Sequence, residues 1–168
     1  MLPSMPPAVS VIFATTSGNT EYVVSVLVDA WRGEGAAVTL LRAERAQPGD
    51  LSGEGALVLA CGTWNQNGVE GQMDPCMDAF LRGRAGAADL AGRPAAVVGL
   101  GDGRYYYTGR ATEHLLRFLR EHGGTPCGSP LLVIGTPEGQ EEKIRAWAGK
   151  FLESIPAVPS ASRCSAFP

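Results

Sequence analysis

The sequence predicts an α/β fold in which a five-stranded parallel sheet is covered by helices on both faces. Strand-like and helix-like segments alternate along the 168 residues, a pattern typical of parallel sheets with right-handed crossovers. The strand-like runs are apolar along most of their length, as in strands that are buried on both faces. The length matches one domain with a single substantial core.

The first half of the chain supplies three of the predicted strands. The first spans residues 9–14 and leads into a helix at 21–32, where apolar residues recur at helical spacing. The second and third strands are expected at 37–41 and 56–60. A loop at 61–68 follows, because its residues tolerate left-handed backbone angles.

The second half is expected to complete the sheet and its helical layers. Hydrophobic periodicity predicts a helix at 74–84, a strand at 95–98, a helix at 111–122, a strand at 129–134 and a helix at 138–155. The domain then spans residues 9–155. Residues 1–8 are interpreted as a flexible leader and residues 156–168, rich in Ala, Ser and Pro, as a disordered tail.

Composition narrows the class of protein. A net charge of -3 argues against nucleic acid or an anionic membrane as the partner. The chain has no apolar run of about 18 residues, and residues 1–8 lack the basic start and apolar run of a signal peptide. We therefore expect a cytoplasmic protein without a metal site, and we expect it to be a monomer.

Two residue types are interpreted as structural rather than functional. The four cysteines, Cys61, Cys76, Cys127 and Cys164, form no C-x-x-C pair and are expected to be reduced. Arginine outnumbers lysine twelve to two. Because the arginines fall mostly on predicted helix faces and loops, this excess is interpreted as compositional bias.

A polar stretch joins the first strand to its helix. Its hydroxyl and amide side chains, together with the unpaired N–H groups at a helix N-terminus, favour a bound anion. The lysine that a nucleoside-triphosphate loop requires is missing, so a terminal monophosphate is the better candidate. An ordinary capped turn is the alternative. The stretch consists of Thr15, Thr16, Ser17, Gly18, Asn19 and Thr20.

Three loops are expected to meet at one edge of the sheet. With a strand order of 2-1-3-4-5, ligands bind beyond the carboxyl ends of the strands, between the first and third. Trp64 and Tyr105 lie in the predicted loops after the third and fourth strands. Together they could sandwich a planar ring, although each alone could equally cover core residues.

Over residues 9–155 the chain resembles the flavodoxin family, of the short-chain type. Residues 13–21 (FATTSGNTE) are similar to the family's phosphate-binding signature. Residues 61–64 (CGTW) resemble its second flavin-contacting loop, and residues 99–105 (GLGDGRY) its third. The resemblance implies a flavodoxin-like three-layer sandwich. The fifth strand leads into the last helix without the insertion of long-chain members.

The resemblance also implies noncovalently bound FMN. Trp64 and Tyr105 would flank the isoalloxazine, and the backbone from Leu100 to Asp102 would contact its pyrimidine edge. The predicted cofactor-binding residues are Thr15, Thr16, Ser17, Gly18, Asn19, Thr20, Gly62, Thr63, Trp64, Asn65, Gly68, Gly99, Leu100, Gly101, Asp102, Tyr105 and Gly109. A dinucleotide fingerprint is excluded, because Arg104 occupies the position of its third glycine.

The function implied by the resemblance is low-potential, one-electron transfer, with FMN shuttling between semiquinone and hydroquinone. No catalytic residue is expected, and the expected partners are a flavodoxin reductase and an electron acceptor. Two alternatives stay open. One is an FMN-dependent NAD(P)H:quinone or flavin reductase of the same fold, and the other is a flavodoxin-like activating partner of another enzyme.

The sequence departs from the family pattern in two places. Asn65 follows the tryptophan where members often have glycine, so we expect a less stabilised semiquinone. Residues 65–67 (NQN) are neutral where many relatives carry acids, and Arg104 adjoins Tyr105. Fewer negative charges beside the flavin predict a less negative hydroquinone couple.

Overall fold

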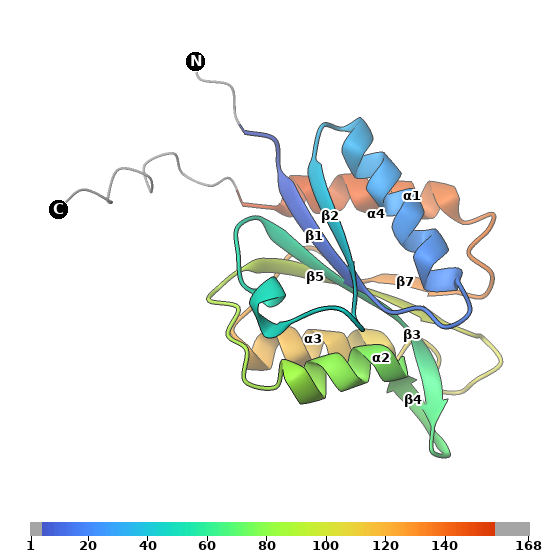
Figure 1. Ribbon diagram of the computed structural model, residues 1–168. Coiled ribbons are helices and arrows are strands. Elements are labelled where there is room, and N and C mark those ends of the chain that lie inside the picture. Colours follow the sequence, from blue (N-terminus) through green and yellow to red (C-terminus); the bar gives the residue numbers. More distant parts are fainter. Residues whose placement is uncertain (1–4, 157–168) are drawn as a thin grey trace.

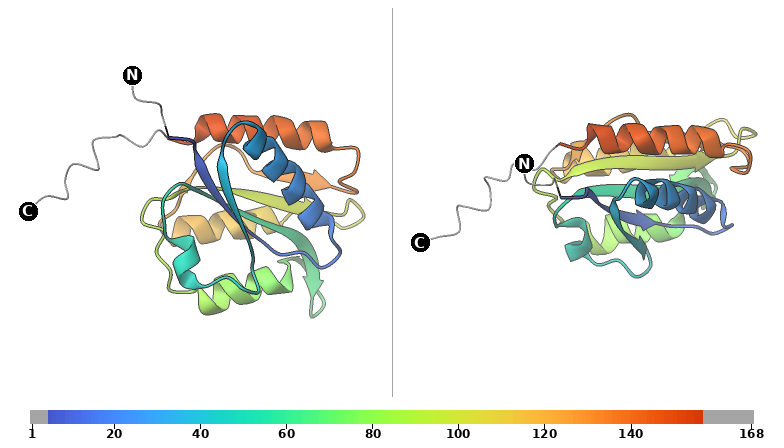
Figure 2. Two further views of the ribbon diagram at one scale, coloured as in Figure 1. Left: turned by 45° about the horizontal axis from the view of Figure 1, so that its top comes forward. Right: turned by 90° about the horizontal axis from the view of Figure 1, so that it is seen from above.

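The computed structural model describes residues 5–156 and shows three layers, a sheet between two layers of helices (Figures 1 and 2). Helices α1 (Asn19–Gly33) and α4 (Glu141–Ser154) cover one face. Helices α2 (Pro75–Asp78) and α3 (Ala111–Glu121) cover the other. The predicted α/β fold class is confirmed. The predicted leader and tail fall mostly outside the described residues, and β1 already begins at Ala8.

The sheet follows the order β2-β1-β3-β5-β6, with β7 also paired to β5. These pairings are all parallel; Val11, for example, lies between Leu40 and Val58. The strand predicted at 129–134 corresponds to β7, and the two-residue strand β6 precedes it, so the long strands keep the predicted order although the sheet has more pieces. The bounds are β1 (Ala8–Phe13), β2 (Ala37–Arg42), β3 (Ala56–Gln66), β5 (Pro94–Gly101), β6 (Thr125–Pro126) and β7 (Leu131–Ile134).

The loop predicted at residues 61–68 is wrong. Strand β3 continues to Gln66 and pairs with the antiparallel strand β4 (Val69–Met73), which projects beyond the sheet in Figure 1. Asn67 and Gly68 both have positive φ, 53° and 78°, as the two-residue turn of a hairpin requires. The backbone groups that a loop would expose to water are therefore paired across the hairpin.

Two predicted helices differ from the structure, one in its helix type and one in its first residue. The one predicted at 74–84 begins as α2 and continues as a π-helical segment, η2 (Ala79–Arg84), in which the Ala85 N–H donates to the Phe80 carbonyl. Helix α4 begins at Glu141 rather than at residue 138, because Gly139 has a φ of 94° that is incompatible with a helix. A short 3-10 turn, η1 (Pro48–Leu51), lies between β2 and β3.

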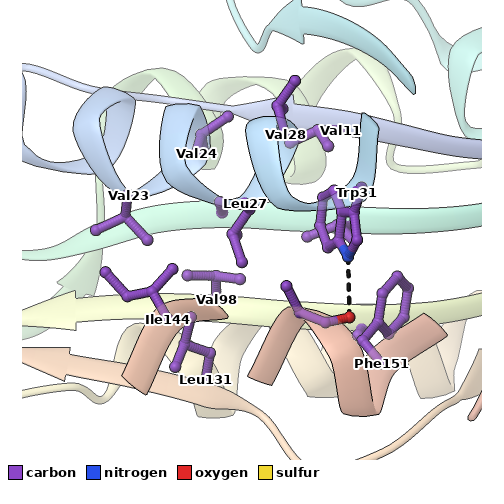
Figure 3. Packing of buried hydrophobic residues seen from close by; sticks show 14 of the residues in the cluster. Val11, Val23, Val24, Leu27, Val28, Trp31, Val98, Leu131, Ile144 and Phe151 are labelled. Atoms are coloured by element: carbon purple, nitrogen blue, oxygen red, sulfur yellow. Dashed lines mark hydrogen bonds between the residues drawn. The ribbon is translucent and has the colours of Figure 1, made fainter. Parts of the chain in front are cut away.

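Side chains of the sheet alternate between two apolar cores. On the face of α1 and α4, Leu27 and Trp31 pack with Val98 and Phe151 (Figure 3). The Trp31 ring centroid lies 5.5 Å from that of Phe151, and its indole N–H donates to the Ala148 carbonyl at 3.1 Å. A second cluster on the α2 and α3 face includes the neighbouring strand residues Leu57 and Leu59. Because β3 is buried on both faces, a shift of its register would misplace both cores.

Arg93 is an exception to the interpretation of the arginine excess as compositional bias, because it is buried and holds the fold together. It is 5 % exposed and lies directly before β5. Its guanidinium donates to the Ser10 hydroxyl at 3.0 Å and to four backbone carbonyls, those of Asp50, Leu51, Glu54 and Gly55. These contacts join the amino-terminal ends of β1, β3 and β5. Within residues 5–156 no helix is both long enough and apolar enough to cross a membrane.

Candidate functional site

A cavity of about 810 Å³ lies at the carboxyl-terminal edge of the parallel sheet. Its walls come from the loop after β1, the β3–β4 hairpin, the end of β5 with the segment after it, and the loop after β7, which lie along the right-hand side of Figure 1. This volume is in the range of small-molecule sites. The lining residues are Thr16, Ser17, Asn19, Thr20, Gly62, Thr63, Trp64, Asn65, Glu70, Gly71, Leu100, Gly101, Asp102, Arg104, Tyr105, Tyr107, Thr108, Gly135 and Thr136.

One end of the cavity is formed by the start of α1. Gly18 adopts a left-handed conformation with φ 92°, and no side chain caps the helix. The Thr15 hydroxyl accepts a hydrogen bond from the Gly18 N–H at 3.0 Å, which closes the turn. The first N–H groups of α1 have no side-chain cap, and Ser17, Asn19 and Thr20 line the cavity at this helix start, an arrangement that suits an anion.

The β3–β4 hairpin supplies a second wall. Trp64 lies on the extension of β3 and not in a loop, and Asn65 lies where the pairing with β4 is irregular. The hairpin is held against α3, because the Ala111 N–H donates to the Thr63 hydroxyl at 3.2 Å and His114 Nε2 lies 2.9 Å from the Gly71 carbonyl oxygen. These contacts fix the strand that carries Trp64.

The segment after β5 supplies the third wall and a charge pair. Arg104 Nε donates to both carboxylate oxygens of Asp102, at 3.0 and 2.9 Å, and its Nη2 donates to Oδ2 as well. The hydrogen bonds from Arg104 lower the pKa of Asp102 to about 2. Because the guanidinium and the carboxylate carry opposite charges, the pair leaves little net charge at this side of the cavity.

Three consecutive tyrosines follow this charge pair. Tyr105 and Tyr107 line the cavity, whereas Tyr106 is 86 % exposed. The Tyr106 and Tyr107 rings meet edge to face at 4.8 Å, and the Tyr106 N–H donates to the Glu70 carboxylate at 3.1 Å. This contact links the segment after β5 to the hairpin, so the two walls are held together.

Most of the residues predicted from the sequence line this cavity. Five do not, namely Thr15, Gly18, Gly68, Gly99 and Gly109. Gly68 is at the hairpin turn, and Gly99 and Gly109 pack closely against Thr112 and Leu132. For all of the predicted residues, including those that line the cavity, a role in cofactor binding stays a prediction.

Other lining residues were missed by sequence reasoning. Gly135 and Thr136 follow β7, and the rule that ligands bind beyond strand ends applies to that strand as well. Glu70, Gly71, Tyr107 and Thr108 carry no local signal, since hairpin pairing and loop folding bring them to the cavity. Arg104 was considered only for its charge.

The residues present fit FMN. The start of α1 offers N–H and hydroxyl donors for a phosphate, and Trp64 and Tyr105 offer aromatic faces for a planar ring in the same cavity. Among residues 5–156 no group of three or more His, Cys, Asp or Glu is placed to hold a metal ion. Cys61, Cys76 and Cys127 are free thiols, and Cys164 lies outside the described residues.

Comparison with known proteins gives a consistent picture. The family model described as Flavodoxin matches residues 11–147. A flavodoxin of Maridesulfovibrio salexigens is 28% identical over 148 residues, covering 86% of this chain and 97% of that protein. NADPH-dependent diflavin oxidoreductase 1 of Cryptococcus neoformans var. neoformans serotype D is 27% identical, but the match covers 89% of this chain and only 24% of that protein.

Solved structures agree on the fold. The crystal structure of oxidised flavodoxin 1 from Bacillus cereus superposes with a TM-score of 0.79 at 24% identity, covering 89% of this chain and 99% of that one. The Streptococcus pneumonia TIGR4 flavodoxin superposes with a TM-score of 0.76 at 21% identity, covering 87% and 98%.

Proposed function

The chain belongs to the flavodoxin family, and on that premise we propose that it carries single electrons at low potential through noncovalently bound FMN. The family model and the flavodoxin relative support an FMN-binding electron carrier in general. The observation that carries the proposal is the cavity, which combines an uncapped helix start with two aromatic side chains.

Different residues of this chain would bind the phosphate and the ring of FMN. The first turn of α1 and the side chains of Ser17, Asn19 and Thr20 hold the phosphate, while Trp64 and Tyr105 stack on the ring and exclude water from it. Hydrogen bonds to a charged group contribute roughly 1.5–3 kcal/mol each, whereas an aromatic pair adds about 0.5–1.5 kcal/mol beyond its buried area. The phosphate contacts therefore dominate the affinity.

When bound, FMN would supply the one-electron redox chemistry. The chain tunes this chemistry through the charge that it presents. Asp102 is the carboxylate at the proposed pyrimidine contact. It stays ionised, but the positive charge of Arg104 balances its negative charge. This supports a reduced, anionic flavin better than an unpaired carboxylate would.

Flavodoxins transfer electrons between other redox proteins. We propose that the partners of this chain are a flavodoxin reductase and a separate electron acceptor, and that it works as a monomer in the cytoplasm. The diflavin relative supports a reductase partner. That enzyme is named for its use of NADPH, and this chain matches only 24% of it, so the rest of the enzyme has no counterpart in the match.

A titration of the apoprotein tests the proposal. FMN is expected to bind far more tightly than riboflavin, which has no phosphate. Ser17→Ala should weaken FMN binding and leave riboflavin binding unchanged. Thr39→Ala is the matched control, because it also removes an exposed hydroxyl, but from the edge strand β2 and outside the cavity lining. Equal affinities for FMN and riboflavin would contradict the assignment of the phosphate site.

Direct assays separate the two alternatives. A reductase would oxidise NADPH without another protein, whereas a carrier needs a reductase. An activating partner would co-purify with one enzyme and fail to support reductase-dependent reduction of cytochrome c. We expect no NADPH oxidation by the isolated protein and rapid cytochrome reduction once a flavodoxin reductase is added.

A further inference from the structure

Asp74 is a buried carboxylate behind the proposed phosphate site. It is 1 % exposed, and residues 5–156 contain no ion pair to it. Its Oδ1 accepts from the Cys76 N–H at 2.9 Å, which caps α2, and its own N–H donates to the Gly62 carbonyl at 3.1 Å. Its Oδ2 accepts from the Thr16 hydroxyl at 2.8 Å. Asp74 thus connects the β1–α1 loop to the end of β3 and the start of α2.

The contact with Thr16 limits what this loop can offer to a phosphate. A hydroxyl group has one proton, so Thr16 cannot donate to Asp74 and to a phosphate oxygen at the same time. Thr16 lines the cavity, as does Thr20 one turn further on. Within residues 5–156 the Thr20 hydroxyl makes no side-chain hydrogen bond, so its proton is free for a ligand.

We propose that Asp74 is a positioning residue of the phosphate site that holds Thr16 in place and competes with the phosphate of FMN for the Thr16 proton. The inference rests on the proposed function, because FMN is the ligand concerned. It separates two roles within one loop. Thr16 anchors the loop to the core, while Thr20 and the N–H groups of α1 bind the phosphate.

Asp74→Asn tests the competition with little change of shape. The amide oxygen can still accept from the Cys76 N–H. The amide nitrogen now donates to the Thr16 oxygen, so the hydroxyl proton turns towards the phosphate. One more hydrogen bond to a charged group corresponds to at least about tenfold tighter binding. FMN affinity should therefore rise about tenfold, while riboflavin affinity stays unchanged.

Two controls separate this effect from loss of charge alone. Asp78→Asn removes the same charge one helical turn away, where the side chain pairs with Arg82 and not with the loop. It should change FMN affinity by less than about threefold. In a Thr16→Val background Asp74→Asn should also lose most of its effect, because no hydroxyl proton is available to be released.

A second pair of variants tests the assignment with Asp74 in place. Thr16→Val removes a proton that is already given to Asp74, whereas Thr20→Val removes one that is free for the ligand. FMN affinity should fall less in Thr16→Val than in Thr20→Val, and Thr16→Ser should match the wild type. A larger loss in Thr16→Val, at unchanged thermal stability, would overturn the proposal.

The remaining outcomes are decisive as well. FMN affinity that is unchanged or weaker in folded Asp74→Asn means that Asp74 is only an anchor, and equal gains in Asp78→Asn mean a general charge effect. Either result overturns the competition while the wild type still binds FMN. A wild-type protein that binds no FMN would instead remove the proposed function, and this inference with it.

Discussion

Arg93 should be the side chain on which the amino-terminal end of the sheet depends. The substitution Arg93→Met keeps an unbranched apolar stem and removes every donor. It removes the 3.0 Å hydrogen bond to the Leu51 carbonyl, which is left buried without a partner. It also removes four partly buried hydrogen bonds, to Ser10, Asp50, Glu54 and Gly55.

The magnitude follows from these contacts. One buried acceptor without a partner costs about 1–3 kcal/mol, and each partly buried bond about 0.5–1 kcal/mol. Burial of the Arg93 guanidinium is itself unfavourable, as its pKa lowered by desolvation indicates, and the variant no longer has this cost, which offsets part of the loss. We therefore expect the free energy of unfolding to fall by about 3 kcal/mol, which lowers Tm by roughly 6–12 °C.

Urea unfolding, followed by tryptophan fluorescence of the apoprotein, measures this loss. FMN affinity should change by less than about twofold, because Arg93 lies at the sheet edge opposite the cavity. Arg45→Met is the control, since Arg45 is exposed and its side chain makes no hydrogen bond within residues 5–156. A loss below about 1 kcal/mol in Arg93→Met would refute the reasoning, as would a parallel loss of FMN affinity.

Three further predictions concern the site and the neighbouring core. Asp102 should stay ionised as the pH falls through its ordinary value of 3.8 and take up a proton only near its pKa of about 2, so the stabilising pair is present above this range and lost below it. In Arg104→Ala, carboxyl NMR titration should show this pKa raised towards 3.8, because the side-chain hydrogen bonds are lost while the backbone N–H of residue 104 still donates to Asp102. Cys61 is buried and its pKa is raised to about 12, so alkylation at pH 8 followed by peptide mass spectrometry should leave it unmodified in the folded protein and modify it in urea. Asn65→Gly should raise the potential of the first one-electron step of bound FMN by about 40 mV or less, corresponding to about 1 kcal/mol, and an unchanged potential would mean that the bulged backbone at this position does not respond to the flavin.

The parts of the fold that sequence could predict are those set by local patterns. Apolar runs such as residues 56–60 indicate buried parallel strands, and five such runs in an alternating chain leave few possible sheet orders. The hairpin was missed although Asn67 and Gly68 are a typical two-residue turn, because the polar residues before them suggested a loop. Local composition alone could not show that Trp64 belongs to a strand.

Long-range contacts are what the sequence could not supply. Arg93 finds its carbonyl acceptors some forty residues earlier in the chain, and Thr16 and Asp74 are 58 positions apart. Neither pair leaves a motif, because the spacing depends on how the strands are arranged in the sheet. The cavity-lining residues of the β1–α1 loop and Tyr105 were predictable, since they follow the ends of β1 and β5.

Anaerobic stepwise photoreduction of the FMN-loaded protein, followed by its visible spectrum, tests one-electron carriage most directly. The account predicts that a blue, long-wavelength-absorbing one-electron form accumulates before full reduction. Direct conversion to the fully reduced flavin, with no such form at any stage, would contradict it and favour a two-electron reductase.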